Sequence, residues 1–294
     1  MTNSQFETTA PASGSGLQVP LVDAAGATHV GRVRTKNEDS YLIATLQRSM
    51  LVHDASPDAA GWFTGEPAGT LLIVADGMGG HGGGDIASRV AVQTTAGYLL
   101  NVMPWATRRQ EPPSGRSSLP GVREQLSSAL LAGDSSVKST GVKAGVPQMG
   151  TTLTVAFVSW PFLYVAHVGD TRCCVYRERT LTRLTTDHTL AQQFVDERGG
   201  EVEPPFQWHN ILWNSLGGNE DAPNPQVIKQ KLEPNDVLLL CSDGLTKHVE
   251  DDQVAALLAE NTSNAARCAR LVETANANGG TDNVTVIVAT VRVS

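Results

Sequence analysis

The segment that most constrains the fold is an apolar run that ends in an acid and a cluster of glycines, residues 71–88 (LLIVADGMGGHGGGDIAS). Five apolar residues predict a buried strand, Asp76 follows it, and six of the next eight residues are glycine. Apolar residues at helical spacing continue over 86–100. The chain therefore places an acid and a tight backbone turn between a buried strand and a helix.

Residues 77–82 also match the G-x-G-x-x-G pattern of a dinucleotide-binding turn, which would indicate a dinucleotide-dependent oxidoreductase. That fold needs an acid about 20 residues beyond the glycines to hold the ribose. Residues 96–110 contain no acid, and Asp76 would repel a pyrophosphate at the turn. The sequence therefore disfavours this alternative.

Acids recur where other predicted strands end or begin. Strand-like runs end in Gly-Asp at Asp170 and in Asp-Gly at Asp243, and Asp282 stands in a glycine turn before the last strand. Glu38 and Asp39 lie between two early strands. Singly, each acid is explained as an ordinary turn residue. Carboxylates brought together, however, repel one another unless a cation shares them.

A cation held by these acids would be coordinated by oxygen alone. The four cysteines and seven histidines show no metal-ligand spacing, so we expect Mg²⁺ or Mn²⁺. Glycine beside an acid, as at Gly77, lets a backbone carbonyl approach the ion. Two such ions can activate water for attack on phosphorus. Arg34, four residues before Glu38, is placed to hold the phosphate.

The predicted elements favour an α+β fold with largely antiparallel sheets. Predicted strands cover 27–34, 40–45, 71–75, 151–160, 162–170, 172–184, 236–241 and 283–293, and predicted helices cover 86–100, 122–138, 189–198, 251–260 and 264–276. The strands cluster at both ends and in the middle, with paired helices between them, instead of alternating strictly with helices. Residues 47–69 and 104–120 are predicted loop insertions.

Composition and charge limit the classes of partner and the cellular compartment that we expect for this chain. A net charge of −8 without a basic cluster argues against nucleic acid. The sequence shows neither a signal peptide nor an apolar run of membrane-spanning length, so we expect a cytoplasmic protein without membrane contact. We expect Cys173, Cys174, Cys241 and Cys268 to be free thiols, with the adjacent pair on opposite faces of a strand.

Six short motifs stand in order along the chain: RTKNED (34–39), ADGMGGH (75–81), MGTTL (149–153), VGDTR (168–172), CSDGL (241–245) and GTDNVT (280–285). Together they resemble the metal-dependent protein phosphatase 2C (PPM-type) family in its bacterial serine/threonine phosphatase form, over residues 26–292. Residues 1–22 are rich in Thr, Ser, Ala, Gly and Pro, which predicts a disordered tail, and the resemblance implies one catalytic domain over 23–294. It implies a β-sandwich of two antiparallel sheets flanked by helix pairs, and hydrolysis of phosphoserine and phosphothreonine by direct attack of a metal-bridging hydroxide.

The resemblance also implies a ligand set for two Mg²⁺ or Mn²⁺ ions, possibly three. Asp76 would bridge two metals, and the Gly77 carbonyl would bind one of them. Asp243 and Asp282 would bind the other. Asp170, together with Asp243, would hold the third metal that bacterial members often carry.

Further residues receive roles by the same resemblance. Glu38 and Asp39 would act mainly through metal-bound waters, Asn283 would orient its neighbours, and Arg34 would bind the phosphate. The implied catalytic residues are Arg34, Asp76 and Asp243.

The general acid for the leaving alkoxide stays open. Eukaryotic members have a histidine two residues after the bridging aspartate, where this chain has Met78, which cannot donate a proton. His81 is expected to stabilise its loop, and a metal-bound water is the better candidate for the acid.

Residues 189–218 resemble the family's flap, a segment that borders the cleft and varies with substrate. Phe206, Trp208 and Trp213 are either exposed contacts for a phosphopeptide or a small core that holds the flap in place, with the second slightly favoured. His167 is expected to be a hydrogen-bonded structural histidine. His188 lies in a motif before the flap, and its role stays open.

The predicted function is thus a serine/threonine protein phosphatase that acts as a monomer on phosphorylated proteins, including a serine/threonine kinase or its substrates. The alternative from another class is a catalytically weak phosphatase-like module that binds or regulates. The presence of Asp76, Asp170, Asp243 and Asp282 together with Arg34 argues against that alternative.

Overall fold

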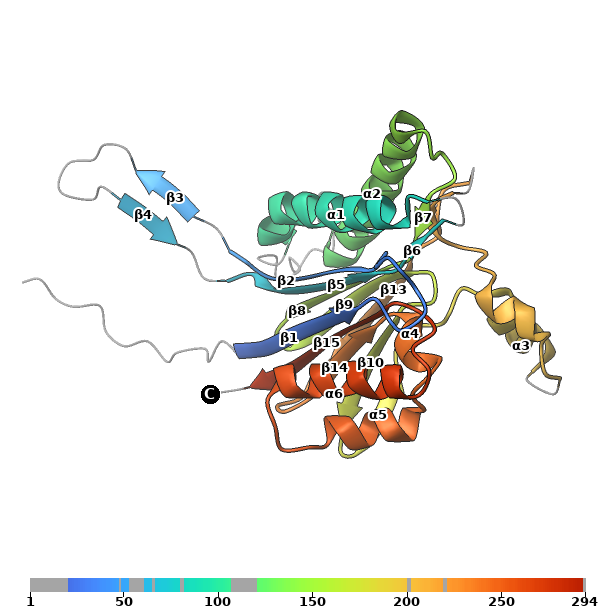
Figure 1. Ribbon diagram of the computed structural model, residues 1–294. Coiled ribbons are helices and arrows are strands. Elements are labelled where there is room, and N and C mark those ends of the chain that lie inside the picture. The colour runs from blue at the N-terminus through green and yellow to red at the C-terminus, as the bar shows by residue number, and fades with distance from the viewer. Residues whose placement is uncertain are drawn as a thin grey trace, which may run out of the picture.

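The protein is a four-layer α-β-β-α sandwich, as Figure 1 shows. The structure, a computed structural model, describes residues 21–47, 49–52, 61–64, 67–79, 82–106, 121–199, 202–218 and 221–292. Two five-stranded antiparallel sheets lie face to face, and a pair of helices covers each outer side. The predicted fold class is confirmed.

The first sheet has the order β13-β9-β8-β5-β2. Its strands are β2 (Ser40–Leu46), β5 (Gly69–Ala75), β8 (Leu153–Ser159), β9 (Phe162–Val168) and β13 (Gln226–Lys231), and helices α1 (Gly84–Ala106) and α2 (Val122–Ala144) lie outside it. Along β5 the side chains alternate between two cores. Leu71 and Ile73 pack toward α1 and α2, whereas Leu72 and Val74 pack between the sheets.

The second sheet has the order β1-β15-β14-β10-β11. Its strands are β1 (Leu21–His29), β10 (Arg172–Arg177), β11 (Thr180–Arg183), β14 (Val237–Cys241) and β15 (Val284–Arg292), and helices α5 (Asp251–Leu258) and α6 (Asn264–Ala277) cover it. Cys173 points into the core between the sheets and Cys174 toward the helices, as predicted. All four cysteines are buried and free.

Shorter elements complete the fold. They are β3 (Ser49–Val52) paired with β4 (Gly61–Thr64), the small sheet of β6 (Gly77–Met78), β7 (Gly150–Thr151) and β12 (Leu216–Gly217), and the helices α3 (Leu190–Arg198), η1 (Phe206–Asn210) and α4 (Asp243–Thr246). The flap contains α3, η1 and β12, and α3 projects from the sandwich at the end opposite β3 and β4 (Figure 1).

Several sequence-based boundaries were wrong. The first strand ends at His29, because residues 30–39 form bends that carry Arg34 into the cleft. The expected loop 47–69 contains β3 and β4. The first long helix continues to Ala106, into the expected loop 104–120, and residues 107–120 lie outside the described residues.

The sheet pairing excludes a dinucleotide-binding unit. The glycine turn follows β5, and β5 pairs antiparallel with both of its neighbours, β2 and β8. A dinucleotide-binding unit requires a parallel partner strand at this point. The expected tail 1–22 lies outside the described residues except for Leu21 and Val22, which belong to β1. None of the described helices has the length and apolarity needed to span a membrane.

Candidate metal centre

The predicted acids converge at one end of the sandwich because the strands of both sheets end there. Asp76 follows β5, Asp170 follows β9, and Asp243 follows β14 after one intervening serine. Asp282 lies two residues before β15, and Asp39 lies directly before β2. Two adjoining cavities, of about 280 and 750 Å³, share the residues Arg34, Asp170, Asn210, Asp243, Lys247 and Asp282.

Asp76 is fixed through its backbone. Its N–H donates to Thr152 Oγ1 at 2.9 Å, and its carbonyl accepts from Thr151 Oγ1 at 2.8 Å and from the Thr152 N–H at 2.9 Å. At the next residue, a Cβ on Gly77 would lie 2.1 Å from the carbonyl oxygen of Gly84. Only glycine therefore allows the turn after β5 to pack against the start of α1.

Two buried carboxylate oxygens of the cluster have no hydrogen-bond partner within the described part of the chain, Asp39 Oδ1 and Asp243 Oδ1. The other oxygen of Asp39 accepts a hydrogen bond from Ser242 Oγ at 2.8 Å. A buried charged oxygen without a partner is costly in free energy, so both atoms indicate a ligand that the chain itself does not supply.

Burial and mutual repulsion raise the pKa of three acids. Burial, joined by the charges of Asp243 and Asp282, raises the pKa of Asp39 to about 7. Burial, with the charge of Asp243 next, raises the pKa of Asp170 to about 8. The pKa of Asp76 lies well above its usual range, because of burial first and then the charges of the surrounding aspartates. At these three carboxylates, burial and repulsion between acids outweigh the positive charge that the described residues supply.

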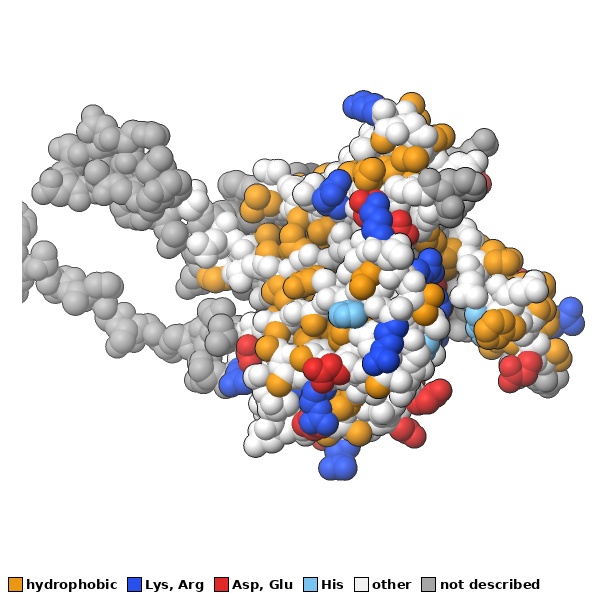
Figure 2. Space-filling model, in the orientation of Figure 1, with side chains coloured by type: hydrophobic (Ala, Val, Ile, Leu, Met, Phe, Trp, Pro, Cys, Tyr) orange, Lys and Arg blue, Asp and Glu red, His pale blue; other side chains and the backbone are white. Residues whose placement is uncertain are grey.

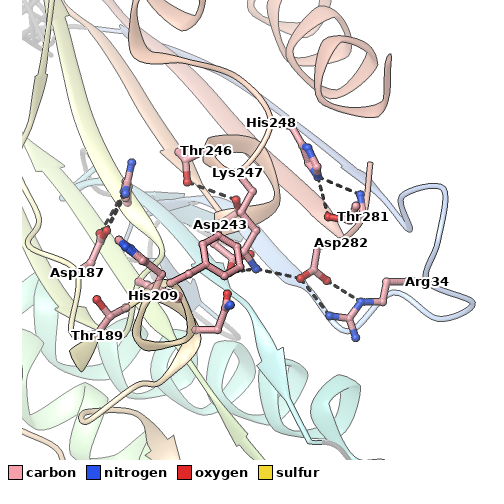
Figure 3. A pocket seen from close by; sticks show the side chains of 14 residues that line it. Arg34, Asp187, Thr189, His209, Asp243, Thr246, Lys247, His248, Thr281 and Asp282 are labelled. Carbon is pink, nitrogen blue, oxygen red and sulfur yellow. Dashed lines mark hydrogen bonds and ion pairs between the residues drawn. The ribbon is translucent and has the colours of Figure 1, made fainter. Parts of the chain in front are cut away.

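Asp282 differs, because two cations of the chain contact it (Figure 3). Arg34 binds it with two nitrogens, Nε to Oδ1 at 3.0 Å and Nη2 to Oδ2 at 3.1 Å. Lys247 Nζ lies 3.2 Å from Asp282 Oδ2 and 2.5 Å from Asp243 Oδ2. Burial alone would raise the pKa of Asp282, but Lys247 and Arg34 hold it below the usual value.

Asn283 connects the loop that carries Arg34 and Glu38 to the start of β15. Its Oδ1 accepts from the Glu38 N–H at 2.8 Å, and its Nδ2 donates to the carbonyls of Val30 and Lys36, both at 2.9 Å. The backbone amide of Asn283 donates to Asp282 Oδ1 at 3.0 Å. This geometry fits the predicted orienting role. Glu38 lines the smaller cavity.

Comparisons with known proteins agree with this geometry. The protein phosphatase 2C family model matches residues 52–278. The chain belongs to the protein phosphatase 2C family. The serine/threonine phosphatase stp of Listeria welshimeri is 30% identical over 264 residues, which are 88% of this chain and 92% of that protein. The serine/threonine protein phosphatase PstP of Mycobacterium tuberculosis is 33% identical over 75% of this chain, which spans only 40% of PstP.

A solved structure extends the comparison to three dimensions. The catalytic domain of the serine/threonine protein phosphatase PstP, in complex with two manganese ions, superposes with a TM-score of 0.69 at 30% identity. The match covers 93% of this chain and all of that one. The predicted family and the predicted enzyme class, a serine/threonine protein phosphatase, are confirmed.

The residues of this phosphatase 2C chain fit divalent cations, although they are not arranged as a closed ligand set. Within the described residues, no three His, Cys, Asp or Glu side chains already converge at metal-binding geometry. Asp243 and Asp282 direct oxygens at Lys247 and Arg34 instead. The unpartnered oxygens of Asp39 and Asp243 and the raised pKa values nevertheless match an all-oxygen site for Mg²⁺ or Mn²⁺.

Sequence reasoning missed three residues that support the cluster: Thr152, Ser242 and Lys247. Lys247 carried a usable signal, because a residue four positions after Asp243 shares its face if a helix starts there. Ser242 and Thr152 had no local signal, because their partners Asp39 and Asp76 are distant in sequence.

The aromatic residues of the flap divide into two kinds. Trp208 is half-buried and packs edge-on against Phe194, as expected of a residue that holds the flap in place. Trp213 packs against His188 but is 44% exposed, so it is not part of a core. Phe206 is 83% exposed and lines the larger cavity. The space-filling view shows hydrophobic and acidic side chains on the projecting flap (Figure 2).

The two histidines near the flap are structural. The buried His167 ring bonds Thr154 Oγ1 at 2.8 Å and the Thr186 carbonyl at 3.1 Å, and burial lowers its pKa to about 3. His188 accepts from the Gly169 N–H at 3.1 Å, and burial lowers its pKa to about 4. His81 lies outside the described residues.

Proposed function

We propose that this chain hydrolyses phosphoserine and phosphothreonine in proteins at the cleft formed by its strand ends, with divalent cations held by Asp76, the Gly77 carbonyl, Asp243 and Asp282. The observation that carries the proposal is the concentration of half-buried carboxylates around two buried oxygens that have no partner among the described residues, Asp39 Oδ1 and Asp243 Oδ1. Mg²⁺ or Mn²⁺ would supply Lewis acidity that lowers the pKa of water and offsets the phosphoryl charge.

The side chains around the cluster perform the binding and orienting. Arg34, about half exposed at the rim, presents a planar guanidinium to an incoming phosphate while Asp282 fixes its orientation. Asn283 holds the loop on which Arg34 and Glu38 lie. Asp170 lies beside Asp243 and is the candidate for a third cation. Met78 lines the smaller cavity and cannot donate a proton, so the general acid remains unassigned.

A phosphorylated segment of a protein fits the larger cavity better than a small phosphate ester does. The volume of the larger cavity, about 750 Å³, exceeds what a phosphate group alone requires. Phe206 lines this cavity and offers an exposed apolar contact. The relatives' names, serine/threonine phosphatase, support the same substrate class. A kinase or its substrates as partners, the monomeric state and the cytoplasmic location stay predictions from the sequence.

Phosphate release from a phosphothreonine peptide tests the proposal. We expect turnover with Mn²⁺, none with excess EDTA, and a loss of about a thousandfold in kcat for Asp243→Asn, because a metal ligand stabilises the transition state by several kcal/mol. Asp252→Asn is the matched control, since Asp252 lies exposed in the first turn of α5 and outside the cleft.

A folded wild-type chain that releases no phosphate with Mn²⁺ or Mg²⁺ would contradict the proposal and favour the binding module. Equal losses in Asp243→Asn and Asp252→Asn would contradict the assignment of Asp243 to the centre.

A further inference from the structure

The ammonium group of Lys247 contacts two of the proposed metal ligands, Asp243 and Asp282. Lys247 follows α4, one helical turn after Asp243, and its ammonium nitrogen lies 2.5 Å from Asp243 Oδ2 and 3.2 Å from Asp282 Oδ2 (Figure 3). The same side chain lines both cavities of the cleft. A positive charge of the chain therefore lies at the carboxylates proposed for one of the two divalent cations.

The contacts of Asp282 leave little room for a divalent cation while Lys247 stays in place. Arg34 and Lys247 together engage both oxygens of Asp282, and Lys247 also engages Oδ2 of Asp243. A divalent cation needs oxygens of the same two carboxylates, and it repels a nearby ammonium group. The Lys247 ammonium and a divalent cation therefore cannot both contact the carboxylates of Asp243 and Asp282 at the same time.

Lys247 is able to leave. Its side chain is 34% exposed and its four-carbon stem is flexible, so the ammonium can move toward the larger cavity and remain hydrated there. Arg34 is less free to give way, because it holds Asp282 with two nitrogens.

We propose that Lys247 competes with a divalent cation for the carboxylates of Asp243 and Asp282 and thereby lowers the metal affinity of this side of the centre. The inference rests on the proposed metal centre and adds a residue that tunes it. Lys247 is a positioning residue in this scheme: it holds the two carboxylates in the metal-free protein and releases them when metal binds.

Isothermal titration of Mn²⁺ into the EDTA-stripped full chain tests the competition. For Lys247→Gln we expect the Mn²⁺ dissociation constant to fall about fivefold, the change that corresponds to the loss of a partly exposed ion pair. Lys247→Arg keeps the positive charge and is expected to bind Mn²⁺ no more tightly than the wild type. Circular dichroism of each variant establishes that it is folded.

A second readout needs no metal. In EDTA the melting temperature of Lys247→Gln is expected to lie about 2–4 °C below that of the wild type, because Asp243 and Asp282 lose a shared counter-charge. With saturating Mn²⁺ the difference is expected to vanish.

Lys138→Gln is the matched control. Lys138 also pairs with an aspartate four residues before it, Asp134, at 3.0 Å, and its side chain is 31% exposed. The pair lies on α2 and outside both cavities. Lys138→Gln is therefore expected to leave the Mn²⁺ affinity unchanged.

Each other outcome overturns the proposal. An unchanged or weaker Mn²⁺ affinity in Lys247→Gln would overturn the competition, and a weaker one would show that Lys247 assists metal binding. An equal gain in Lys138→Gln would trace the effect to net charge instead. If neither the wild type nor Lys247→Gln binds Mn²⁺, the proposed metal centre itself fails. If both bind Mn²⁺ with equal affinity, the metal centre stands and only the competition by Lys247 fails.

Discussion

Two parts of the acid cluster, Asp282 on one side and Asp76 with Asp39 on the other, differ in how the charge of their carboxylates is balanced. Around Asp282 the chain supplies two cations, Arg34 and Lys247, and the pKa of that carboxyl is low despite burial. Around Asp76 and Asp39 burial and neighbouring acids raise the pKa values instead. One side is electrostatically satisfied by the protein, whereas the other is satisfied only by protons or by a bound cation.

Position in the fold explains the difference. Asp76 follows a strand buried on both faces, and the charges that shift its pKa are those of other aspartates. Asp282 lies in the loop before β15 with 19% of its side chain exposed, within reach of Lys247 and Arg34. The metal-free protein is therefore expected to store unfavourable electrostatic energy on the Asp76 side alone.

The largest contrast is expected between Asp76→Asn and Asp282→Asn in the metal-free protein. Asp76→Asn removes a half-buried acid that its neighbouring aspartates repel, so we expect the melting temperature in EDTA to rise by at least about 3 °C. Asp282→Asn removes the partner of Arg34 and Lys247, so we expect a decrease of about 2–4 °C. Both variants are expected to lose phosphatase activity.

Thermal unfolding in EDTA at neutral pH measures both changes in melting temperature. Loss of metal-dependent activity in each variant serves as the control that the substitution alters the metal centre. Melting temperatures that move in the same direction would break the contrast between the two sides.

The contrast also predicts how pH affects stability. The folded-state pKa values of Asp39, about 7, and Asp170, about 8, lie above the unfolded value of about 4. The folded chain then binds more protons than the unfolded chain, so metal-free stability falls as the pH rises from about 5 to 8. Asp282 has the opposite sign, because its pKa is lowered and its contribution is lost only as the pH falls below about 4.

Melting curves in EDTA measure this dependence, and we expect the melting temperature to fall by at least about 3 °C between about pH 5 and pH 8. Saturating Mn²⁺ is expected to flatten it, since the cation replaces the protons. A flat profile in EDTA would show that the raised pKa values do not govern stability.

Much of the site was predictable from the sequence because its acids are marked locally. A buried apolar run followed by Asp-Gly, as at Asp76 and Asp243, indicates both a strand end and a close backbone turn. Antiparallel pairing then brings strand ends of both sheets to one edge of the sandwich. The fold class followed from predicted strands that cluster at both ends and in the middle of the chain, with paired helices between them.

What escaped prediction depends on contacts between distant segments. Arg34 was predicted as a phosphate ligand, but its partner in the structure, Asp282, is 248 residues away. Local pattern also failed over 47–69, where β3 and β4 form within a polar segment that was expected to be a loop. Neither result follows from residue type or spacing, because each is decided by tertiary packing.

A further expected effect concerns the hydrogen bond that supports Asp39. Ser242 Oγ donates to Asp39 Oδ2 at 2.8 Å and accepts from the buried Thr285 N–H at 2.9 Å. Ser242→Ala leaves both groups without this partner, so we expect a loss of about 1 kcal/mol, or about 2–4 °C in EDTA. The loss is expected to grow above about pH 7, where Asp39 ionises. Ser242→Thr keeps the hydroxyl and serves as the control; a loss independent of pH would attribute the effect to Thr285 instead of Asp39.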